Sequence, residues 1–179
     1  MKVKKKRKES RKMKEWNINK STINDCKGIA EFITIVWNET YKGIVNDKFL
    51  EGLKESEKQR WLNAEKNFDE NNNMQYIIKD DDGKIIGFLK LNRTDDNKTI
   101  EMQSLYLLKD YQKKGIGRKL FEKAFEEARK LRYKKMKIGC LEGNPSNGFY
   151  LKMGGKLIGR RKFELPNETL YENVYEYQL

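Results

Sequence analysis

Between Thr99 and Arg132 the sequence passes directly from a strand pattern, through a short glycine-containing loop, into a long amphipathic helix. The strand is expected at Thr99–Leu108 and the helix at Ile116–Arg132. One face of that helix is traced by the apolar residues Ile116, Leu120, Ala124, Ala128 and Leu131. This succession predicts an α/β domain in which helices pack on one central sheet.

The rest of the chain continues this mixture of strand and helix patterns. The spacing predicts strands at Trp16–Lys20, Met74–Lys79, Lys84–Leu91, Lys135–Leu141, Lys156–Glu164 and Tyr171–Gln178. It predicts helices at Ser21–Glu39, Ser56–Phe68 and Asn144–Met153, with a loop and a short helix between Tyr41 and Leu53. In the second of these helices, the expected inward side chains are Trp61, Leu62 and Phe68. The resulting element order is β-α-α-β-β-β-α-β-α-β-β.

Charge divides the chain into two parts. The first 15 residues hold nine Lys or Arg against two Glu, which gives them a net charge of +7. All 179 residues together have a net charge of +12, so more than half of the net charge lies in this short segment. Residues 1–14 are therefore expected to form a basic, disordered tail, and residues 15–179 a single domain. The run Lys4–Lys8 resembles a phosphate-binding patch, so a nucleic-acid-associated protein is one function class to weigh. Aromatic residues for base stacking are not interleaved with it.

Two features of composition narrow the chemistry. The chain has no histidine, which excludes Ser-His and Cys-His nucleophile systems and the common His-rich zinc sites. Its two cysteines, Cys26 and Cys140, form neither a disulfide framework nor a metal-binding spacing, so no metal is expected. No stretch approaches the ~20 apolar residues of a membrane span. A cytoplasmic protein without a membrane partner is the expectation.

The loop Gln112–Arg118 is suited to an anion. Glycines at 115 and 117 let backbone amides approach a ligand without an intervening Cβ, and the helix that follows adds unpaired N–H groups and a partial positive charge. Lys113, Lys114 and Arg118 add positive potential. By itself the pattern also fits an ordinary strand-to-helix turn with solvated lysines.

Two motifs together resemble those of the GNAT superfamily of acyl-CoA N-acyltransferases. Gln112, Gly115 and Gly117 fill the fixed positions of its Q/R-x-x-G-x-G/A pyrophosphate loop. Downstream, the segment 143–155 resembles the second family motif, in which an Asn precedes a short helix with a Phe-Tyr pair and a closing glycine. The resemblance covers about Trp16–Leu179. It implies the GNAT-type fold, a central mixed but mostly antiparallel sheet flanked by helices.

The resemblance also implies acetyl-CoA as co-substrate and a primary amine as acceptor. The signature strand is expected to separate from Lys135–Leu141 and to hold the pantetheine through free backbone groups. The cofactor-binding positions implied are Leu105, Leu107, Gln112, Lys113, Lys114, Gly115, Ile116, Gly117, Arg118, Asn144 and Tyr150.

Two residues carry the expected chemistry. Glu101 lies where several family members place a catalytic glutamate, and strand alternation would put it on one face with Gln103, Leu105 and Leu107. We expect Glu101 to deprotonate the amine and Tyr150 to protonate the leaving thiolate. A solvent-facing glutamate and a packing aromatic are the structural alternatives. Cys140 is interpreted as a buried strand cysteine rather than a nucleophile.

The sequence leaves the acceptor open. A small amine or polyamine, a protein amine and an aminoglycoside all satisfy the implied reaction, which is direct attack in a ternary complex. A GNAT fold that binds CoA without catalysis is a further alternative, and the sequence is compatible with a homodimer.

Overall fold

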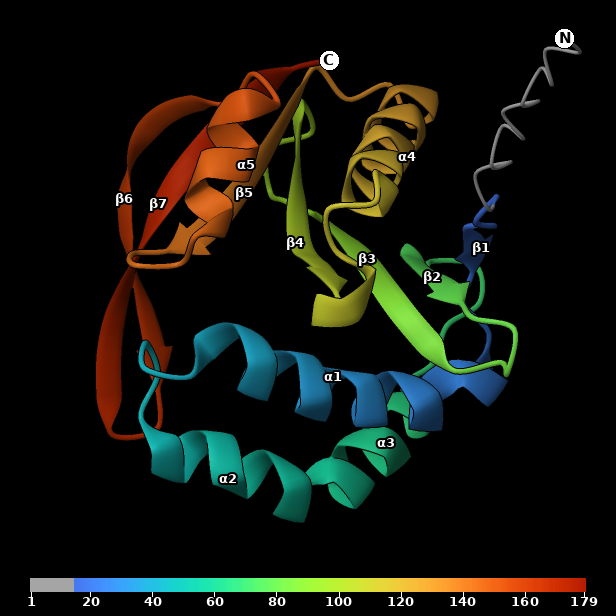
Figure 1. Ribbon diagram of the computed structural model, residues 1–179. Coiled ribbons are helices and arrows are strands. Elements are labelled where there is room, and N and C mark those ends of the chain that lie inside the picture. The colour runs from blue at the N-terminus through green and yellow to red at the C-terminus, as the bar shows by residue number, and fades with distance from the viewer. Residues whose placement is uncertain (1–14) are drawn as a thin grey trace, which may run out of the picture.

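The computed structural model describes residues 15–179, so the basic tail predicted at 1–14 lies outside the described residues. Figure 1 shows the arrangement of the elements. In chain order these are β1 (Asn19–Lys20), a 3-10 turn (Ile23–Asp25), α1 (Cys26–Tyr41), α2 (Asp47–Glu55), α3 (Glu57–Lys66), β2 (Gln75–Lys79), β3 (Ile85–Arg93), β4 (Thr99–Leu107), a second 3-10 turn (Lys109–Tyr111), α4 (Ile116–Lys130), β5 (Lys135–Leu141), α5 (Ser146–Lys152), β6 (Lys156–Leu165) and β7 (Glu168–Gln178).

The strands of residues 15–179 form one seven-stranded sheet in the order β1-β2-β3-β4-β5-β7-β6. Neighbouring strands are antiparallel except β4 and β5, which are parallel and are joined through α4. This confirms the predicted central, mixed and mostly antiparallel sheet. The order also places β5 between β4 and β7, so the parallel pair lies inside the sheet rather than at its edge.

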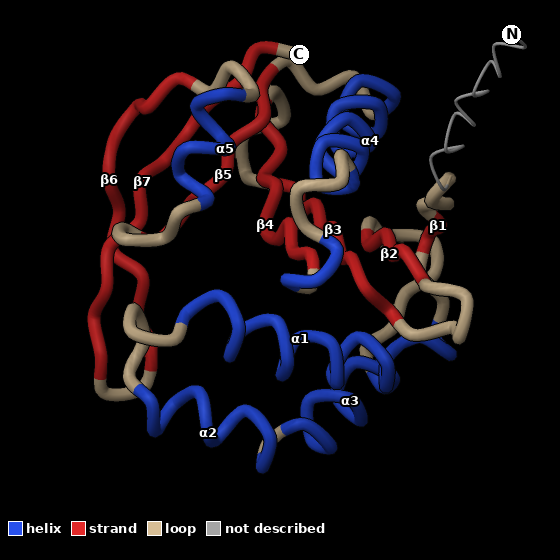
Figure 2. The backbone as a smooth tube through the Cα atoms, viewed as in Figure 1, coloured by secondary structure: helices blue, strands red, loops and turns tan. Residues whose placement is uncertain are grey.

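Helices cover both faces of the sheet (Figures 1 and 2). On one face α1 packs on β3, where the rings of Phe32 and Phe88 lie 6.4 Å apart. On the other face α4 packs so closely on β3 that a Cβ at Gly87 would lie 3.2 Å from Leu120. Phe32 and Val36 of α1 belong to the same hydrophobic core as the buried apolar side chains of β3 and α4. The two faces can therefore be named by their helices, the α1 face and the α4 face.

Three α-helices lie between β1 and β2: the two of the predicted element order, and the short helix expected between them. The short helix expected between Tyr41 and Leu53 is the nine-residue α2. The side chain of Asn46 caps it by accepting a hydrogen bond of 2.8 Å from the backbone N–H of Phe49. α2 and α3 both pack against α1.

Two predictions of inward-facing residues are wrong. No residue of α3 is fully buried and Leu62 is 42% exposed, because α3 packs on α1 and not on the sheet. Trp61 and Phe68 are only partly covered. Leu131 is 41% exposed, since α4 ends at Lys130 and Arg132 adopts a left-handed φ of 64° that turns the chain away.

Candidate active site

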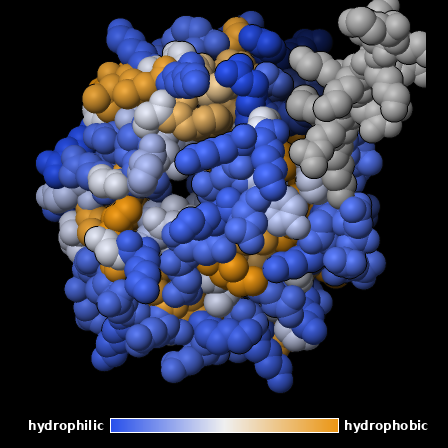
Figure 3. All heavy atoms as spheres, in the orientation of Figure 1, coloured by the Kyte–Doolittle hydropathy of each residue, from blue (hydrophilic) through white to orange (hydrophobic). Residues whose placement is uncertain are grey.

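The parallel strands β4 and β5 are paired over only part of their length. Thr99–Glu101 pairs with Lys135–Lys137, and beyond this point the two strands separate. A cavity of about 620 Å³ lies in the opening and is lined by residues 103–107 of β4 and 138–140 of β5. The space-filling view shows a hollow on this face of the molecule, between the two strands (Figure 3). The predicted separation of the signature strand from its neighbour is therefore present.

Most of the predicted cofactor-binding residues line this cavity. They are Leu105, Leu107, Gln112, Lys113, Gly115, Gly117, Arg118, Asn144 and Tyr150. The side chains of Lys114 and Ile116 do not belong to the lining. Lys114 donates to the backbone oxygen of Asp110 at 2.7 Å, and Ile116 is buried in the core. For Ile116 only the backbone N–H remains a candidate contact.

The loop before α4 is shaped by two residues in left-handed conformations. Gly115 caps α4 with a φ of 80°, and Lys113 has a φ of 57°. The Gln112 side chain donates a hydrogen bond of 3.0 Å to the backbone oxygen of Leu107, which ties the loop to the end of β4. The loop thus brings the free N–H groups of the first turn of α4 to one end of the cavity.

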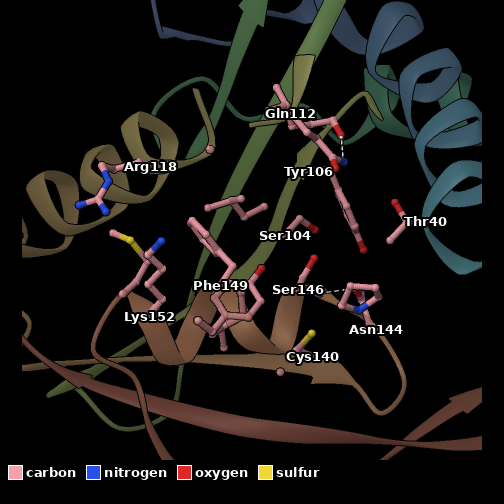
Figure 4. Close-up of a pocket in the computed structure, with 18 of the residues that line it drawn as sticks. Thr40, Ser104, Tyr106, Gln112, Arg118, Cys140, Asn144, Ser146, Phe149 and Lys152 are labelled. Atoms are coloured by element: carbon pink, nitrogen blue, oxygen red, sulfur yellow. Dashed lines mark hydrogen bonds between the residues drawn. The ribbon is translucent and has the colours of Figure 1, made fainter. Parts of the chain in front are cut away.

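That end of the cavity is basic. Lys113 and Arg118 come from the loop and α4, and Lys152 comes from the last turn of α5. Figure 4 shows Arg118 and Lys152 beside each other, whereas Thr40, Tyr106 and Asn144 lie toward the opposite end. Lys152 was not predicted, because nothing local marks a helix-terminal lysine as facing another element.

A β-bulge in β4 corrects the predicted position of Glu101. Lys90 of β3 pairs with Ser104 and Leu91 pairs with Met102, which leaves Gln103 as an extra residue on β4. The alternation of side chains is reversed at this point. Glu101 therefore does not share a face with Leu105 and Leu107, as strand periodicity had predicted.

The register shows which face each residue occupies. Glu101 is opposite Asn92 and Tyr106 is opposite Phe88, both on the α1 face. Leu107 is opposite Gly87 and lies on the α4 face. The Glu101 carboxylate is ion-paired with Arg161 of β6 and is not part of the cavity lining. Its role as the base stays a prediction.

Tyr150 projects from α5 into the cavity and is 5% exposed. Within residues 15–179 its hydroxyl has no hydrogen-bond partner, although its backbone oxygen accepts from the Tyr177 hydroxyl at 2.9 Å. Burial, followed by the proximity of Cys140, raises the pKa of Tyr150 well above its ordinary value. The hydroxyl is therefore a neutral donor that faces the cavity.

The position of Tyr150 depends on Gly155, and this can be tested by stability. A Cβ at Gly155 would lie 2.6 Å from the Tyr177 hydroxyl and 2.9 Å from the backbone oxygen of Tyr150. We expect Gly155→Ala to lower the free energy of unfolding by about 1–3 kcal/mol in thermal or chemical denaturation. Gly148→Ala is the control, because Gly148 lies within α5 and has open space around it. There alanine should be neutral or stabilising. Equal effects at the two glycines would contradict this account.

Sequence reasoning missed a pair of tyrosines at the other end of the cavity. The hydroxyls of Tyr41 and Tyr106 lie 3.0 Å apart and connect the end of α1 to β4. Burial raises the pKa of both, to about 12 for Tyr106. The two tyrosines are 65 residues apart in the sequence, so no local pattern marks them as neighbours.

Cys140 is the buried strand cysteine that was predicted, and Asn144 makes a local hydrogen bond at the start of α5. Cys140 lines the cavity but is buried, and burial, with a contribution from Glu172, raises the pKa of its thiol to about 12. The reactive thiolate is therefore disfavoured. The side-chain oxygen of Asn144 accepts from the backbone N–H of Ser146 at 2.8 Å, at the start of α5. Contact of Asn144 with pantetheine stays a prediction.

Two further properties concern residues 15–179 alone. They contain no group of three or more Cys, Asp or Glu side chains arranged to hold a metal ion. None of their helices has the length and apolar composition needed to span a bilayer.

Comparison with known proteins gives a consistent result. Residues 32–155 match the family model described as the Acetyltransferase (GNAT) family. The chain is 24% identical over 159 residues to the uncharacterized N-acetyltransferase YuaI of Bacillus subtilis, an alignment that covers 87% of this chain and 88% of the relative.

Solved structures share the fold. The PaiA N-acetyltransferase of Thermoplasma acidophilum, in complex with coenzyme A, superposes with a TM-score of 0.73 at 23% identity and covers 93% of this chain and 100% of that one. YncA of Salmonella typhimurium, a putative acetyltransferase with its cofactor acetyl-CoA, gives a TM-score of 0.60 at 19% identity and covers 92% and 94%.

Proposed function

The chain belongs to the GNAT acetyltransferase family and is an acyl-CoA-dependent N-acetyltransferase, and we propose that it transfers the acetyl group of acetyl-CoA directly to a primary amine in a ternary complex. One observation carries the proposal. A single cavity runs from the N-terminus of α4, through the opening between β4 and β5, to the hydroxyls of Tyr150, Tyr106 and Tyr41. It offers an anion site at one end and neutral donors at the other.

The basic end would hold the pyrophosphate of acetyl-CoA. The amides around Gly115 and Gly117 provide donors, and Lys113, Arg118 and Lys152 provide positive charge. Two structures with the same fold were solved with CoA or acetyl-CoA, which supports this assignment. The pantetheine would then run along β4, whose backbone groups beyond Glu101 have no partner on β5.

The chemistry requires proton transfer at both the amine and the sulfur. The acceptor enters as an ammonium ion, and Glu101 takes one proton from it, so that the nitrogen lone pair can attack the thioester carbon. The carbon–sulfur bond then breaks, and the CoA thiolate receives a proton from the Tyr150 hydroxyl. The phenol regains a proton from the protonated amide nitrogen through solvent. Backbone N–H groups of the separated β4 are suited to stabilise the oxyanion of the intermediate.

The first test of this proposal is binding. At a free acetyl-CoA concentration 100-fold above the dissociation constant, linkage stabilises the folded protein by about 2.7 kcal/mol, which should appear as a raised melting temperature. Gly117→Phe should abolish that shift because the ring would occupy the pyrophosphate site. The fold should survive, since no atom lies within 4 Å of the Cβ position.

Gly52→Phe is the matched control. Gly52 is also a helical glycine with open space around its Cβ position, but it lies in α2, away from the cavity. That variant should keep the full acetyl-CoA shift. An unchanged melting curve of the wild type at saturating acetyl-CoA would refute the proposed function.

Turnover separates catalysis from binding alone. Release of CoA thiol would be followed with a polyamine, a lysine-containing peptide, a peptide with a free N-terminus and an aminoglycoside. The fastest of these defines the acceptor class. Binding of acetyl-CoA without turnover of any amine would favour the non-catalytic alternative.

A further inference from the structure

Three charged side chains from three different strands meet on the α1 face of the sheet. Arg161 of β6 donates from Nε to the carboxylate of Glu172 on β7 and from an Nη to the carboxylate of Glu101 on β4. Because the strand order is β4-β5-β7-β6, the backbones of Arg161 and Glu101 are three strand spacings apart, roughly 14 Å. The two side chains together bridge that distance.

Between Arg161 and Glu101 lies β5, which has a glycine, Gly139, beside the Glu172 carboxylate. Glu172 is 7% exposed, and its carboxylate occupies the space where a Cβ of Gly139 would lie. Gly139 itself lines the cavity. The buried carboxylate therefore lies against a residue of the cavity lining and holds the guanidinium from the opposite side to Glu101.

The location of Glu101 gives the cluster its significance. Glu101 and Lys137 form the last paired rung before β4 and β5 separate. Glu101, Ser104 and Tyr106 share the α1 face, and Ser104 and Tyr106 line the cavity. The carboxylate is thus held at the start of the opening, on the side away from α4.

Two carboxylates share the one guanidinium, so Arg161 is held from both sides. Lys135 and Lys137 of β5 are occupied by Glu176, at 3.1 and 3.8 Å. By register, the other charged side chains on this face of β3, β5, β6 and β7 are Lys90, Lys135, Lys137, Lys156, Glu168 and Glu176.

We propose that Arg161 is a positioning residue of the acceptor site: anchored on the buried carboxylate of Glu172, it fixes the Glu101 carboxylate beside the opening between β4 and β5. This rests on the proposed function. A glutamate on a strand otherwise samples several rotamers, and a displacement of ~1 Å at a reacting group can cost ~10²-fold in rate.

The test compares neighbouring arginines of β6. Arg161→Gln removes the link, whereas Arg161→Lys keeps the charge but lacks the fork that holds two carboxylates. Arg160→Gln is the control, since Arg160 pairs with Glu142 at 2.7 Å and stacks 3.8 Å from the Tyr171 ring. CoA-thiol release is measured over a pH series with the fastest amine of the panel, or with water as acceptor if no amine reacts.

Both Arg161 variants should lower kcat by roughly 10–10²-fold and keep the wild-type acetyl-CoA melting shift, while Arg160→Gln changes neither. The loss in the Arg161 variants should shrink at alkaline pH, because more of the amine is then already neutral and needs no proton removed by Glu101. A purely structural role would not produce that pH dependence. Arg161 variants that turn over like Arg160→Gln at every pH would overturn the proposal.

Gly139→Ala provides an independent second variant. The added Cβ would displace the Glu172 carboxylate and should reproduce the rate loss with Arg161 still in place. Normal kcat in folded Gly139→Ala would also overturn the proposal. A wild type that fails to bind acetyl-CoA would instead refute the proposed function, so the two failures are distinguishable.

Discussion

Replacement of Glu101 by glutamine is expected to lower turnover at neutral pH by about 10²–10⁴-fold, the range for a positioned acid or base. The amide retains the size of the side chain but cannot accept the proton of the acceptor ammonium. The loss should shrink as the pH approaches the pKa of the acceptor, near 10.4 for an alkyl amine, because more amine then arrives neutral. Steady-state kinetics over a pH series measures both effects.

Glu142→Gln is the control for this prediction. Glu142 is also a glutamate paired with an arginine of β6, but its partner is Arg160 and it does not line the cavity. It should turn over like the wild type. Full activity of Glu101→Gln across the pH series would remove it as the base. The cofactor assignment would survive, since it depends on the loop before α4.

Replacement of Tyr150 by phenylalanine should lower turnover by a similar factor of about 10²–10⁴, with little change in acetyl-CoA affinity. The ring still packs and only the hydroxyl is lost. That hydroxyl has no hydrogen-bond partner within residues 15–179, so its removal should cost little stability. Alkali should not rescue this variant, because the missing group supplies a proton to the leaving thiolate rather than removing one from the amine.

Tyr177→Phe should show the opposite pattern. The Tyr177 hydroxyl donates to the backbone oxygen of Tyr150, so the variant should lose about 1 kcal/mol of stability and retain most of its turnover. Equal kinetic effects of the two substitutions would mean that Tyr150 acts through packing. Chemistry must be rate-limiting for these comparisons, which single-turnover measurements establish.

The sequence by itself determined the parts of the site that are continuous in the chain. The loop from Gln112 to Gly117 and the helix that carries Tyr150 were predictable because each is a continuous segment whose conformation depends on local backbone geometry. Glycine allows a left-handed cap at 115, and the first turn of a helix always leaves N–H groups unpaired. Hydrophobic periodicity placed the strands to within a few residues, because the alternation of side chains along a strand is also a local property of the chain.

Only the tertiary structure decided which side chains meet on the α1 face of the sheet. The bulge at Gln103 moved Glu101 to the opposite face from Leu105, and a bulge is a property of two paired strands rather than of either alone. Arg161 reaches Glu101 because β6 and β7 fold back beside β5, a strand order that no local pattern specifies. Tyr41 meets Tyr106 across 65 residues of sequence because α1 packs on the face that β4 presents after its bulge. Local propensity fixes the elements and the glycine-containing loop before α4, whereas register and strand order, which depend on long-range packing, decide which side chains surround Glu101.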